Sequence, residues 1–337
     1  MKSLQSLTHY QDLVVRIGHE LQNGQNEARK SINRALVQTY WQIGRYIVEF
    51  EQEGNKKASY GSELLNRLSK DLTQSYGKGF SRSNIFQIRT FYLKFQKVQT
   101  LSGLLTWSHY VEILKIDSDL EVEFYIKQCE NENWSVRELK RQMNSMLFHR
   151  LALSRDKSGV LNLAKNGIEI NKPENIVKDP YVLEFLNIPE KEKYYENDLE
   201  EKLIQNMKSF LMELGKGFTF VGRQYKITLG NRHFYIDLVF YHRILKCFVL
   251  IDLKKGEIVH QDIGQMNLYL NYFRREENTE GDTEPIGIVL GSYKDKILIE
   301  YACENISNKL FVSKYQLYLP DKDKLREEIN IFLENQT

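Results

Sequence analysis

The positions of the five prolines divide this chain of 337 residues into two parts. All of them follow residue 172, at Pro173, Pro180, Pro189, Pro285 and Pro320. Proline lacks a backbone donor and breaks helices, so a first half without it can be helical throughout. Apolar residues recur there at helical spacing, as in Leu36, Tyr40, Ile43 and Ile47. We therefore expect an all-helical N-terminal region.

A turn between two expected helices gives the first half a helix-turn-helix-like unit. One helix should end near Tyr76, after which Gly77-Lys78-Gly79 interrupts the pattern and Ser81 caps the next helix. The turn and the second helix carry a local concentration of cations, among them Lys78, Arg82, Arg89 and Lys94. We expect these four side chains to contact nucleic-acid phosphates, with a solvated helix face as the open alternative.

The end of the helical region is predicted from a capping pattern and a change in composition. Ser135 and Glu138 have the spacing of a capping box, which marks the start of a further helix. Residues 151–178 then mix glycine, asparagine and lysine ahead of Pro173. We expect a helical DNA-binding-like domain over residues 1–150, a linker over 151–178 and a second domain over 179–337.

The second half alternates helical and β-rich patterns. Helices are predicted over 198–214, 261–274 and 321–336, and strands over 218–229, 233–241, 246–254, 286–290 and 297–302. This order predicts an α/β or α+β domain with a mixed central sheet flanked by helices.

Two aspartates and a lysine interrupt the apolar strands of the predicted sheet. If the hairpin turn is centred on Ile244-Leu245, Asp237 lies opposite Asp252, and alternation places Lys254 on the same face as Asp252. Burying an unpaired carboxylate costs several kcal/mol, so either a divalent cation or the lysine must offset these charges. Carboxylate oxygens suit Mg²⁺ or Mn²⁺, and a structural salt bridge is the alternative.

A third acid is predicted to join this pair from the preceding helix. The apolar stripe through Leu203 and Met207 continues back to Leu199 and Glu200, which places Glu200 at the inward edge of the helix. Glu201 falls on the solvated side. The alternative for Glu200 is an acid that only favours the helix dipole.

A helical glutamate, then an aspartate, then Asp-x-Lys on the next strand is an order that resembles the PD-(D/E)XK nuclease superfamily. Gln265 and Tyr269 on the following helix are similar to the Q-x-x-x-Y element of its RecB-like branch. Longer blocks resemble the YhcG family, namely residues 178–186, 210–224, 235–256, 264–266 and 285–288, and in the first half 79–81, 107–110 and 134–139. One departure is that Ile236, rather than proline, precedes Asp237. That family joins a winged-helix-like DNA-binding region to a restriction-endonuclease-like PD-(D/E)XK domain.

The resemblance implies a metal-dependent nuclease, with DNA as the expected polymer. Asp237 and Asp252 would hold Mg²⁺ or Mn²⁺, with help from Glu200 and from the backbone carbonyl of Leu253. Lys254 would orient or deprotonate the attacking water. Gln265 and Tyr269 would position Lys254 or the scissile phosphate, and simple helix packing is the alternative for both. A different class of function stays open, a non-catalytic DNA-binding or complex-assembly protein that uses the nuclease fold as a scaffold.

The sequence gives no sign of a membrane segment. Its longest apolar run, Cys247 to Ile251, is far shorter than the roughly 20 residues that span a bilayer. We expect an intracellular, cytoplasmic protein without a membrane partner. Cleavage of two strands with one site per chain would favour a homodimer, and protein partners in genome maintenance or defence also fit the resemblance.

Overall fold

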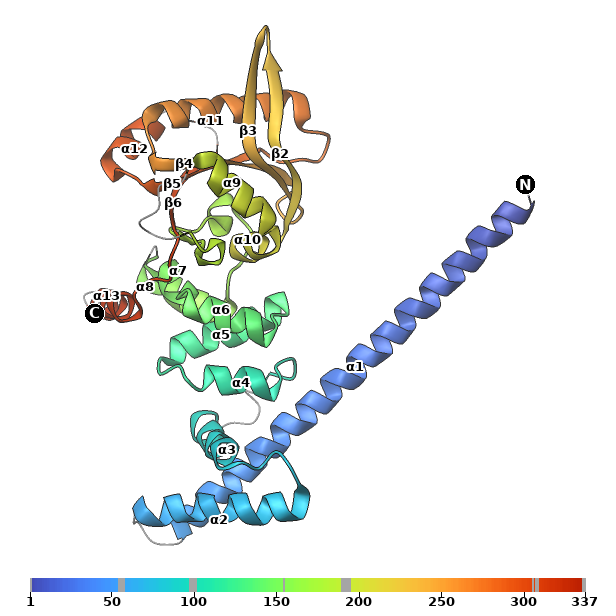
Figure 1. Cartoon of the computed structure of the whole chain (residues 1–337), viewed down its shortest axis with the longest axis vertical. Helices are drawn as coiled ribbons and strands as arrows, with labels where there is room; N and C mark the ends of the chain where they lie inside the picture. The colour runs from blue at the N-terminus through green and yellow to red at the C-terminus, as the bar shows by residue number, and fades with distance from the viewer. Residues whose placement is uncertain are drawn as a thin grey trace. The chain divides into compact units, whose positions relative to one another are not determined.

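The computed structural model (Figure 1) describes residues 2–53, 58–96, 102–153, 155–188, 195–304, 306 and 309–334. The chain divides into two compact units, Met1–Leu139 and Lys140–Thr337. Each unit is described separately below. No helix in these ranges is both long enough and apolar enough to cross a membrane.

The first unit is helical, as predicted. Its helices are α1 (Lys2–Glu53), α2 (Ala58–Tyr76), α3 (Arg82–Lys94), α4 (Trp107–Ile113) and α5 (Asp119–Glu132). The described residues of this unit include no strand, so a β-hairpin wing is not found among them.

Packing in the first unit joins the C-terminal part of α1 to α2 and α3. Ile47, Leu65, Ile85 and Ile88 form the buried centre of this contact. Gly44 makes the close approach of α1 and α3 possible, because a Cβ atom there would lie 2.4 Å from the carbonyl oxygen of Ile88. The crossing of these two helices therefore depends on the absence of a side chain.

The predicted turn between α2 and α3 is confirmed. Helix α2 ends at Tyr76, and Gly77 and Gly79 adopt φ values of +83° and +125°, which favour glycine. Ser81 caps α3 through its side chain, which accepts a hydrogen bond from the backbone N–H of Asn84 at 3.2 Å. The predicted capping box is also present, since the Ser135 N–H donates to Glu138 Oε2 at 2.6 Å and the Glu138 N–H donates to Ser135 Oγ at 3.3 Å.

The first part of the second unit is mostly helical. Their bounds are α6 (Val136–Asn144), which crosses the division, α7 (Leu147–Ala152), α8 (Lys157–Asn166), η2 (Pro173–Ile176), η3 (Glu184–Leu186), α9 (Glu196–Gln205) and α10 (Met207–Leu214). Helix α8 lies inside the segment predicted to be an irregular linker, and Val160, Leu163 and Ala164 are its buried residues. The domain limits of 1–150 and 179–337 stay a prediction.

The second unit is built on a six-stranded mixed sheet. Its strands are β1 (Tyr181–Val182), β2 (Phe218–Leu229), β3 (Arg232–His242), β4 (Cys247–Glu257), β5 (Ile286–Tyr293) and β6 (Lys309–Gln316), in the order β1-β6-β5-β4-β3-β2. Strands β2, β3 and β4 are antiparallel, and β4, β5, β6 and β1 are parallel.

Helices cover both faces of this sheet, so the predicted fold class is confirmed. One face packs against α9 and α10 through residues such as Leu203 and Phe210. The other packs against α11 (His260–Tyr272) and η4 (Phe273–Glu277) through residues such as Met266 and Phe273. Helix α11 contacts β4, β5 and β6, next to which it lies in Figure 1.

The strand predicted over 297–302 is wrong. This segment forms α12 (Lys296–Cys303), the last strand is β6, and α13 (Lys322–Glu334) closes the chain. Asp295 starts α12, because its side chain accepts hydrogen bonds from the N–H groups of Ile297 and Leu298. Ile299, Ala302 and Cys303 then pack on the sheet at helical spacing, and this burial overrides the β-propensity of the isoleucines.

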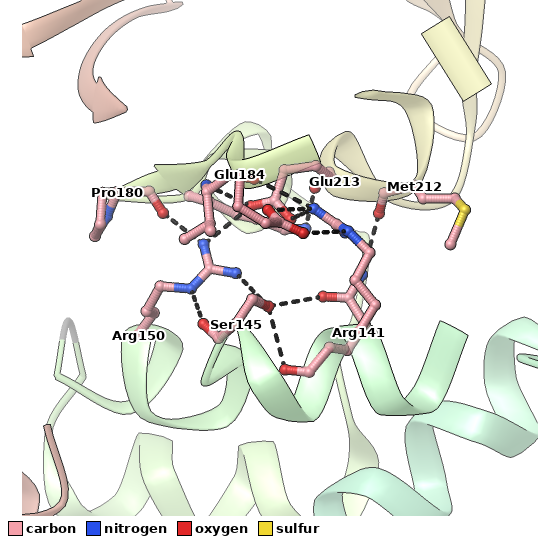
Figure 2. Close-up of polar contacts among 10 residues, drawn as sticks. Arg141, Ser145, Arg150, Pro180, Glu184, Met212 and Glu213 are labelled. Atoms are coloured by element: carbon pink, nitrogen blue, oxygen red, sulfur yellow. Dashed lines mark hydrogen bonds and ion pairs between the residues drawn. The ribbon is translucent and has the colours of Figure 1, made fainter. Parts of the chain in front are cut away.

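A buried charge network joins α6 and α7 to the sheet domain (Figure 2). Glu213 on α10 is 0% exposed, and its carboxylate pairs with Arg150 Nη1 at 3.0 Å and Arg141 Nη2 at 3.2 Å. The N–H of Val182 on β1 also donates to Glu213 Oε1 at 3.0 Å. Arg150 and Arg141 reach further to the carbonyl of Pro180 and the carboxylate of Glu184. Through these ion pairs and hydrogen bonds, residues 140–152 are attached to the sheet of the second unit.

Candidate active site

The register of β3 and β4 brings the two aspartates together. Pairing runs from His242↔Cys247 to Leu238↔Ile251, so the next step along both strands places Asp237 beside Asp252. The predicted register is confirmed. The turn is longer than the two residues assumed, because it spans Arg243 to Lys246, with Lys246 at φ +53°.

The two strands separate at these aspartates. The side chain of Asp237 replaces the next backbone pair, since its Oδ2 accepts a hydrogen bond from the N–H of Leu253 at 2.7 Å. Ile236 and Val239 pack in one cluster on the α11 face although they are three residues apart. Strict alternation of side chains is therefore broken at Asp237, and its carboxylate is directed to the gap between β3 and β4.

Asp252 and Lys254 form a largely buried ion pair, as their spacing predicts. Lys254 Nζ lies 2.8 Å from Asp252 Oδ2 and 3.9 Å from Asp262 Oδ1. Asp252 is 3% exposed, and burial together with the neighbouring Asp237 raises the pKa of its carboxyl. Burial alone would lower the pKa of Lys254, but the Asp252 carboxylate outweighs this effect, so the net pKa is raised. The lysine is held as an ammonium ion.

Glu200 joins the site through a glutamine. It is 8% exposed on α9, at the predicted inward edge, whereas Glu201 is exposed. The amide nitrogen of Gln224 donates to Glu200 Oε2 at 2.7 Å and to Asp237 Oδ1 at 3.0 Å. One side chain of β2 thus holds two carboxylates within reach of each other.

Gln224 was missed as a site residue by the sequence reasoning. It lies opposite Asp237, between the pairs Arg223↔Leu238 and Tyr225↔Ile236, because an irregularity between Phe220 and Gly222 shifts the register of β2. Its φ of +45° is uncommon for a residue with a side chain. A strained backbone at a cluster of carboxylates is typical of functional sites.

Two further acids surround the site and were also missed. Glu196, at the start of α9, accepts a hydrogen bond from the N–H of Lys255 at 3.2 Å and raises the pKa of Asp237. Asp262 accepts from the N–H of Val259 at 2.9 Å at the start of α11 and faces Lys254. In the sequence both resemble ordinary first-turn helix acids, so their position depends on the tertiary fold.

Gln265 and Tyr269 lie on the side of the site formed by α11. The Gln265 amide donates to the hydroxyl of Tyr269, which in turn donates to the carbonyl of Tyr235 at 3.2 Å. Burial is the main reason why the pKa of Tyr269 is raised, with smaller effects from Gln265, Asp252 and Lys254. The pair therefore borders the candidate site and also contacts the first half of β3 at Tyr235.

The electrostatics of the site favour a divalent cation. Burial raises the pKa of Glu200, Asp237 and Asp252, so all three carboxylates lack sufficient positive charge around them. Within the described ranges, no three His, Cys, Asp or Glu side chains are grouped as a preformed metal site. Hard oxygen donors on two adjacent strands fit Mg²⁺ or Mn²⁺, and the Leu253 carbonyl lies next to Asp252 in the chain.

The four cations predicted to bind nucleic acid have different surroundings. Arg89 forms a two-pronged contact with Glu51, at 2.9 and 2.7 Å, and Lys94 donates to the carbonyl of Ile116. Lys78 and Arg82 are exposed. A pocket of about 530 Å³ in the same unit is lined by side chains such as Ile43, Phe50 and Leu68 and offers no charge for a phosphate.

The fold and the order of these residues define a class of protein. A helical glutamate comes before β2, an aspartate lies within β3, and Asp-x-Lys follows on β4. A glutamine and a tyrosine lie on the helix after it. This is the organisation of a PD-(D/E)XK nuclease domain.

Comparison with known proteins identifies the family. Residues 174–330 match the family described as YhcG PDDEXK nuclease domain, and residues 16–150 match the DUF1016 N-terminal domain. The chain is 38% identical over 352 residues to the "Putative nuclease YhcG" of Escherichia coli strain K12, covering 95% of this chain and 93% of that protein. The chain belongs to the YhcG family.

Solved structures show more distant similarity. A repair endonuclease from Pyrococcus abyssi is 17% identical, with a TM-score of 0.27, over 39% of this chain and 50% of that one. An EndoMS–dsDNA complex is 16% identical, with a TM-score of 0.28, over 40% and 51%. These matches span about half the length of the solved chains.

Proposed function

We propose that this chain is a divalent-metal-dependent DNA endonuclease whose N-terminal unit binds nucleic acid. The observation that carries the proposal is the meeting of Asp237, Asp252 and Lys254 where β3 and β4 separate. A buried group of two carboxylates and an ammonium has little value for the stability of a sheet, but it matches the needs of phosphodiester hydrolysis.

In the proposed mechanism, Asp237, Asp252, Glu200 and the Leu253 carbonyl hold Mg²⁺ or Mn²⁺. When bound, such an ion lowers the pKa of a water molecule and neutralises charge on the phosphate. Lys254, held as an ammonium ion by Asp252, orients the attacking water and stabilises the negative charge that develops on the phosphate. Gln265 and Tyr269 would position Lys254 or the scissile phosphate, and Tyr269 also donates to the carbonyl of Tyr235 on β3. Gln224 keeps Glu200 beside Asp237.

Nucleic-acid binding by the N-terminal unit is proposed for Lys78 and Arg82, which are exposed at the α2–α3 turn. Arg89 and Lys94 belong to the same proposal, but each would have to exchange an internal contact for a phosphate. A homodimer in the cytoplasm, with one site for each strand, completes the proposed setting.

The test is a cleavage assay with purified protein. Linear, supercoiled, single-stranded and branched DNA, and RNA, are incubated with Mg²⁺, Mn²⁺ or EDTA. We expect cleavage of DNA only with metal, and a loss of at least about 10²-fold in rate for Asp252→Asn and for Lys254→Ala. Lys208→Ala, an exposed lysine on α10, is the matched control and should cleave like the wild type.

The outcomes separate the two classes of function. Full activity of the Lys254→Ala protein would contradict the proposed site. Tight DNA binding without cleavage under every metal condition would favour a non-catalytic assembly protein.

A further inference from the structure

The hairpin of β2 and β3 continues beyond the rest of the sheet. Their pairing extends from Tyr225↔Ile236 to Leu229↔Arg232, whereas β4 pairs with β3 only from Leu238 to His242. Figure 1 shows these two strands rising past the other strands as a two-stranded ribbon. We call residues 223–236 the ribbon.

The ribbon is firmly supported on one side. Ile227 and Ile236 are buried in the cluster that contains α11, and the rings of Tyr225 and Phe273 lie 5.4 Å apart. At the tip, Leu229 pairs with Arg232 across a two-residue turn in which Gly230 has φ +59°. Two-residue turns with such positive φ values give tight, well-defined hairpins. The ribbon is therefore a tight hairpin that packs against the α11 cluster through Ile227 and Ile236.

The opposite side of the ribbon is polar and exposed. It consists of the cross-strand pairs Lys226↔Tyr235 and Thr228↔His233, and all four residues are exposed. At the start of this row, the Gln224 amide donates a hydrogen bond to Asp237 Oδ1 at 3.0 Å. The exposed face of the ribbon thus leads directly to the carboxylates of the candidate site.

The charge of the ribbon has one sign. Residues 223–236 contain three Lys or Arg residues and one His, but no Asp or Glu. Neither Lys226 nor Arg232 forms an ion pair with an acid in the described part of the chain. Tyr235, opposite Lys226, leaves 48% of its surface exposed. Lys226 lies beside this ring, and Arg232 lies at the tip, where it pairs with Leu229 on the other side of the ribbon. Uncompensated cations and an exposed aromatic ring are typical of a nucleic-acid surface.

We infer that the ribbon binds double-stranded DNA and delivers a phosphate to the site. The major groove of B-form DNA, about 12 Å wide, admits a two-stranded β-ribbon, whereas the deep, narrow major groove of duplex RNA does not. The inference rests on the proposed nuclease function and specifies its substrate class as duplex DNA. Lys226 and Arg232 contact phosphates, and Tyr235 lies against the sugar or base edge.

The test measures binding rather than cleavage. The full chain is titrated in EDTA with fluorescent duplex DNA, duplex RNA and single-stranded DNA of one sequence, from 50 to 300 mM salt. The double variant Lys226→Ala with Arg232→Ala is compared with Lys165→Ala with Lys208→Ala, which removes two exposed lysines from α8 and α10. Both double variants change the net charge by the same amount.

We expect the ribbon variant to bind duplex DNA about ten to a hundred times more weakly at 100 mM salt, with a salt slope lower by about 2. The control variant should bind like the wild type. Exchange of the two cations, Lys226→Arg with Arg232→Lys, should restore the slope, which excludes misfolding as the cause. The wild type should prefer duplex DNA to both other ligands.

Two results would overturn the inference: equal affinity of the ribbon and control variants, or binding of duplex RNA or single-stranded DNA as tight as that of duplex DNA. Because the titration contains EDTA and no metal, loss of DNA binding by the ribbon variant is measured independently of cleavage. A negative result here is therefore distinct from a negative result in the nuclease assay.

Discussion

The pKa of a buried carboxyl group in this molecule depends on how many Arg and Lys side chains lie around it. Glu213 and Asp252 are both buried, yet the pKa of Asp252 is raised and that of Glu213 is lowered. Burial would raise the pKa of Glu213 as well, but Arg150, Lys178 and Arg141 surround it and hold its pKa at about 2. Glu213, whose charge is offset by three cations, has a structural role. Asp252, which has too little positive charge around it, is the candidate metal ligand.

Glu213→Gln tests the structural role. Removal of the charge leaves Arg150 and Arg141 buried without their common counter-ion. We expect the free energy of unfolding of the second unit to fall by about 3 to 5 kcal/mol. Hydrogen exchange of the β3 and β4 amides measures this effect, and Glu201→Gln, at an exposed position on α9, is the control with no expected change.

The same pair of proteins gives a pH prediction. The folded pKa of Glu213, about 2, is below its ordinary value of 4.5, so its contribution is complete above pH 4.5 and is lost as the pH falls toward 2. The stability difference between the wild type and Glu213→Gln should therefore shrink by about 3 kcal/mol over this range. A difference that stays constant from pH 5 to pH 2.5 would contradict the ion-pair explanation.

Asp252→Asn tests the site without a substrate. Its raised pKa indicates that the ionised carboxylate is disfavoured in the fold, so the variant should be no less stable than the wild type in EDTA. Millimolar Mg²⁺ or Mn²⁺ should raise the melting temperature of the wild type, because a ligand of the folded state stabilises it. The variant should lose this rise. An equal metal-induced shift in both proteins would place the metal elsewhere.

How far the sequence predicts the site depends on the range of each contact. The spacing Asp252-x-Lys254 and the hairpin turn are local, so the ion pair and the register were both predictable. Gln224 was not, since its place opposite Asp237 depends on an irregular register in β2. Glu196 reaches Lys255 across 59 positions of sequence, which no periodicity encodes.

At the scale of elements, the crossing of α1 and α3 is set by one glycine. A methyl group at Gly44 would lie 2.4 Å from the Ile88 carbonyl oxygen and 2.8 Å from Tyr92 Cβ. Gly44→Ala should therefore destabilise the first unit by about 1 to 3 kcal/mol, despite the better helix propensity of alanine.

Gly24→Ala, in the same helix, is the matched control. A Cβ atom there would meet nothing within 4 Å, so the change should stabilise α1 by roughly 0.5 to 1 kcal/mol. Tryptophan fluorescence reads the first unit alone, because Trp41, Trp107 and Trp134 all lie within it. If urea unfolding shows the same sign for both variants, close helix packing at Gly44 is not the determining feature.

Elements were predictable where local pattern and burial agree. The limits of β2 match its predicted range of 218–229, because a glycine turn bounds it at each end. The segment 297–302 has strong β-propensity but forms α12, since the cap at Asp295 and one-sided burial on the sheet decide its structure. Propensity is a weak guide where tertiary contacts oppose it.

At the scale of the whole molecule, the matched sequence families and the packing divide the chain at different places. The nuclease match begins at residue 174 and the N-terminal match ends at residue 150, whereas compactness divides the chain after Leu139. The network of Figure 2 lies on the second side of this division, and in it Arg141 and Arg150 supply two of the cations around Glu213. We therefore expect the smallest stable unit of the sheet domain to include residues 140–152.

A pair of fragments tests this conclusion. A fragment of residues 133–337 keeps both arginines and the Ser135–Glu138 cap of α6, so we expect it to unfold cooperatively. A fragment of residues 174–337 leaves Glu213 with Lys178 as its remaining cation and the N–H of Val182 as a donor. Its free energy of unfolding should be lower by about 3 to 5 kcal/mol, or it should fail to fold.

The comparison needs a control for the lost helices themselves. Residues 133–337 with Glu213, Arg141 and Arg150 replaced by Leu, Met and Met keep α6 and α7 but remove the buried charges. Replacement of a buried ionic group by apolar residues of similar size is often neutral or stabilising. We therefore expect this triple variant to stay folded, whereas Arg150→Met alone should be nearly as unstable as the short fragment. Equal urea midpoints for Arg150→Met and the unchanged 133–337 fragment would show that apolar packing, and not the charge network, holds α6 and α7 to the sheet.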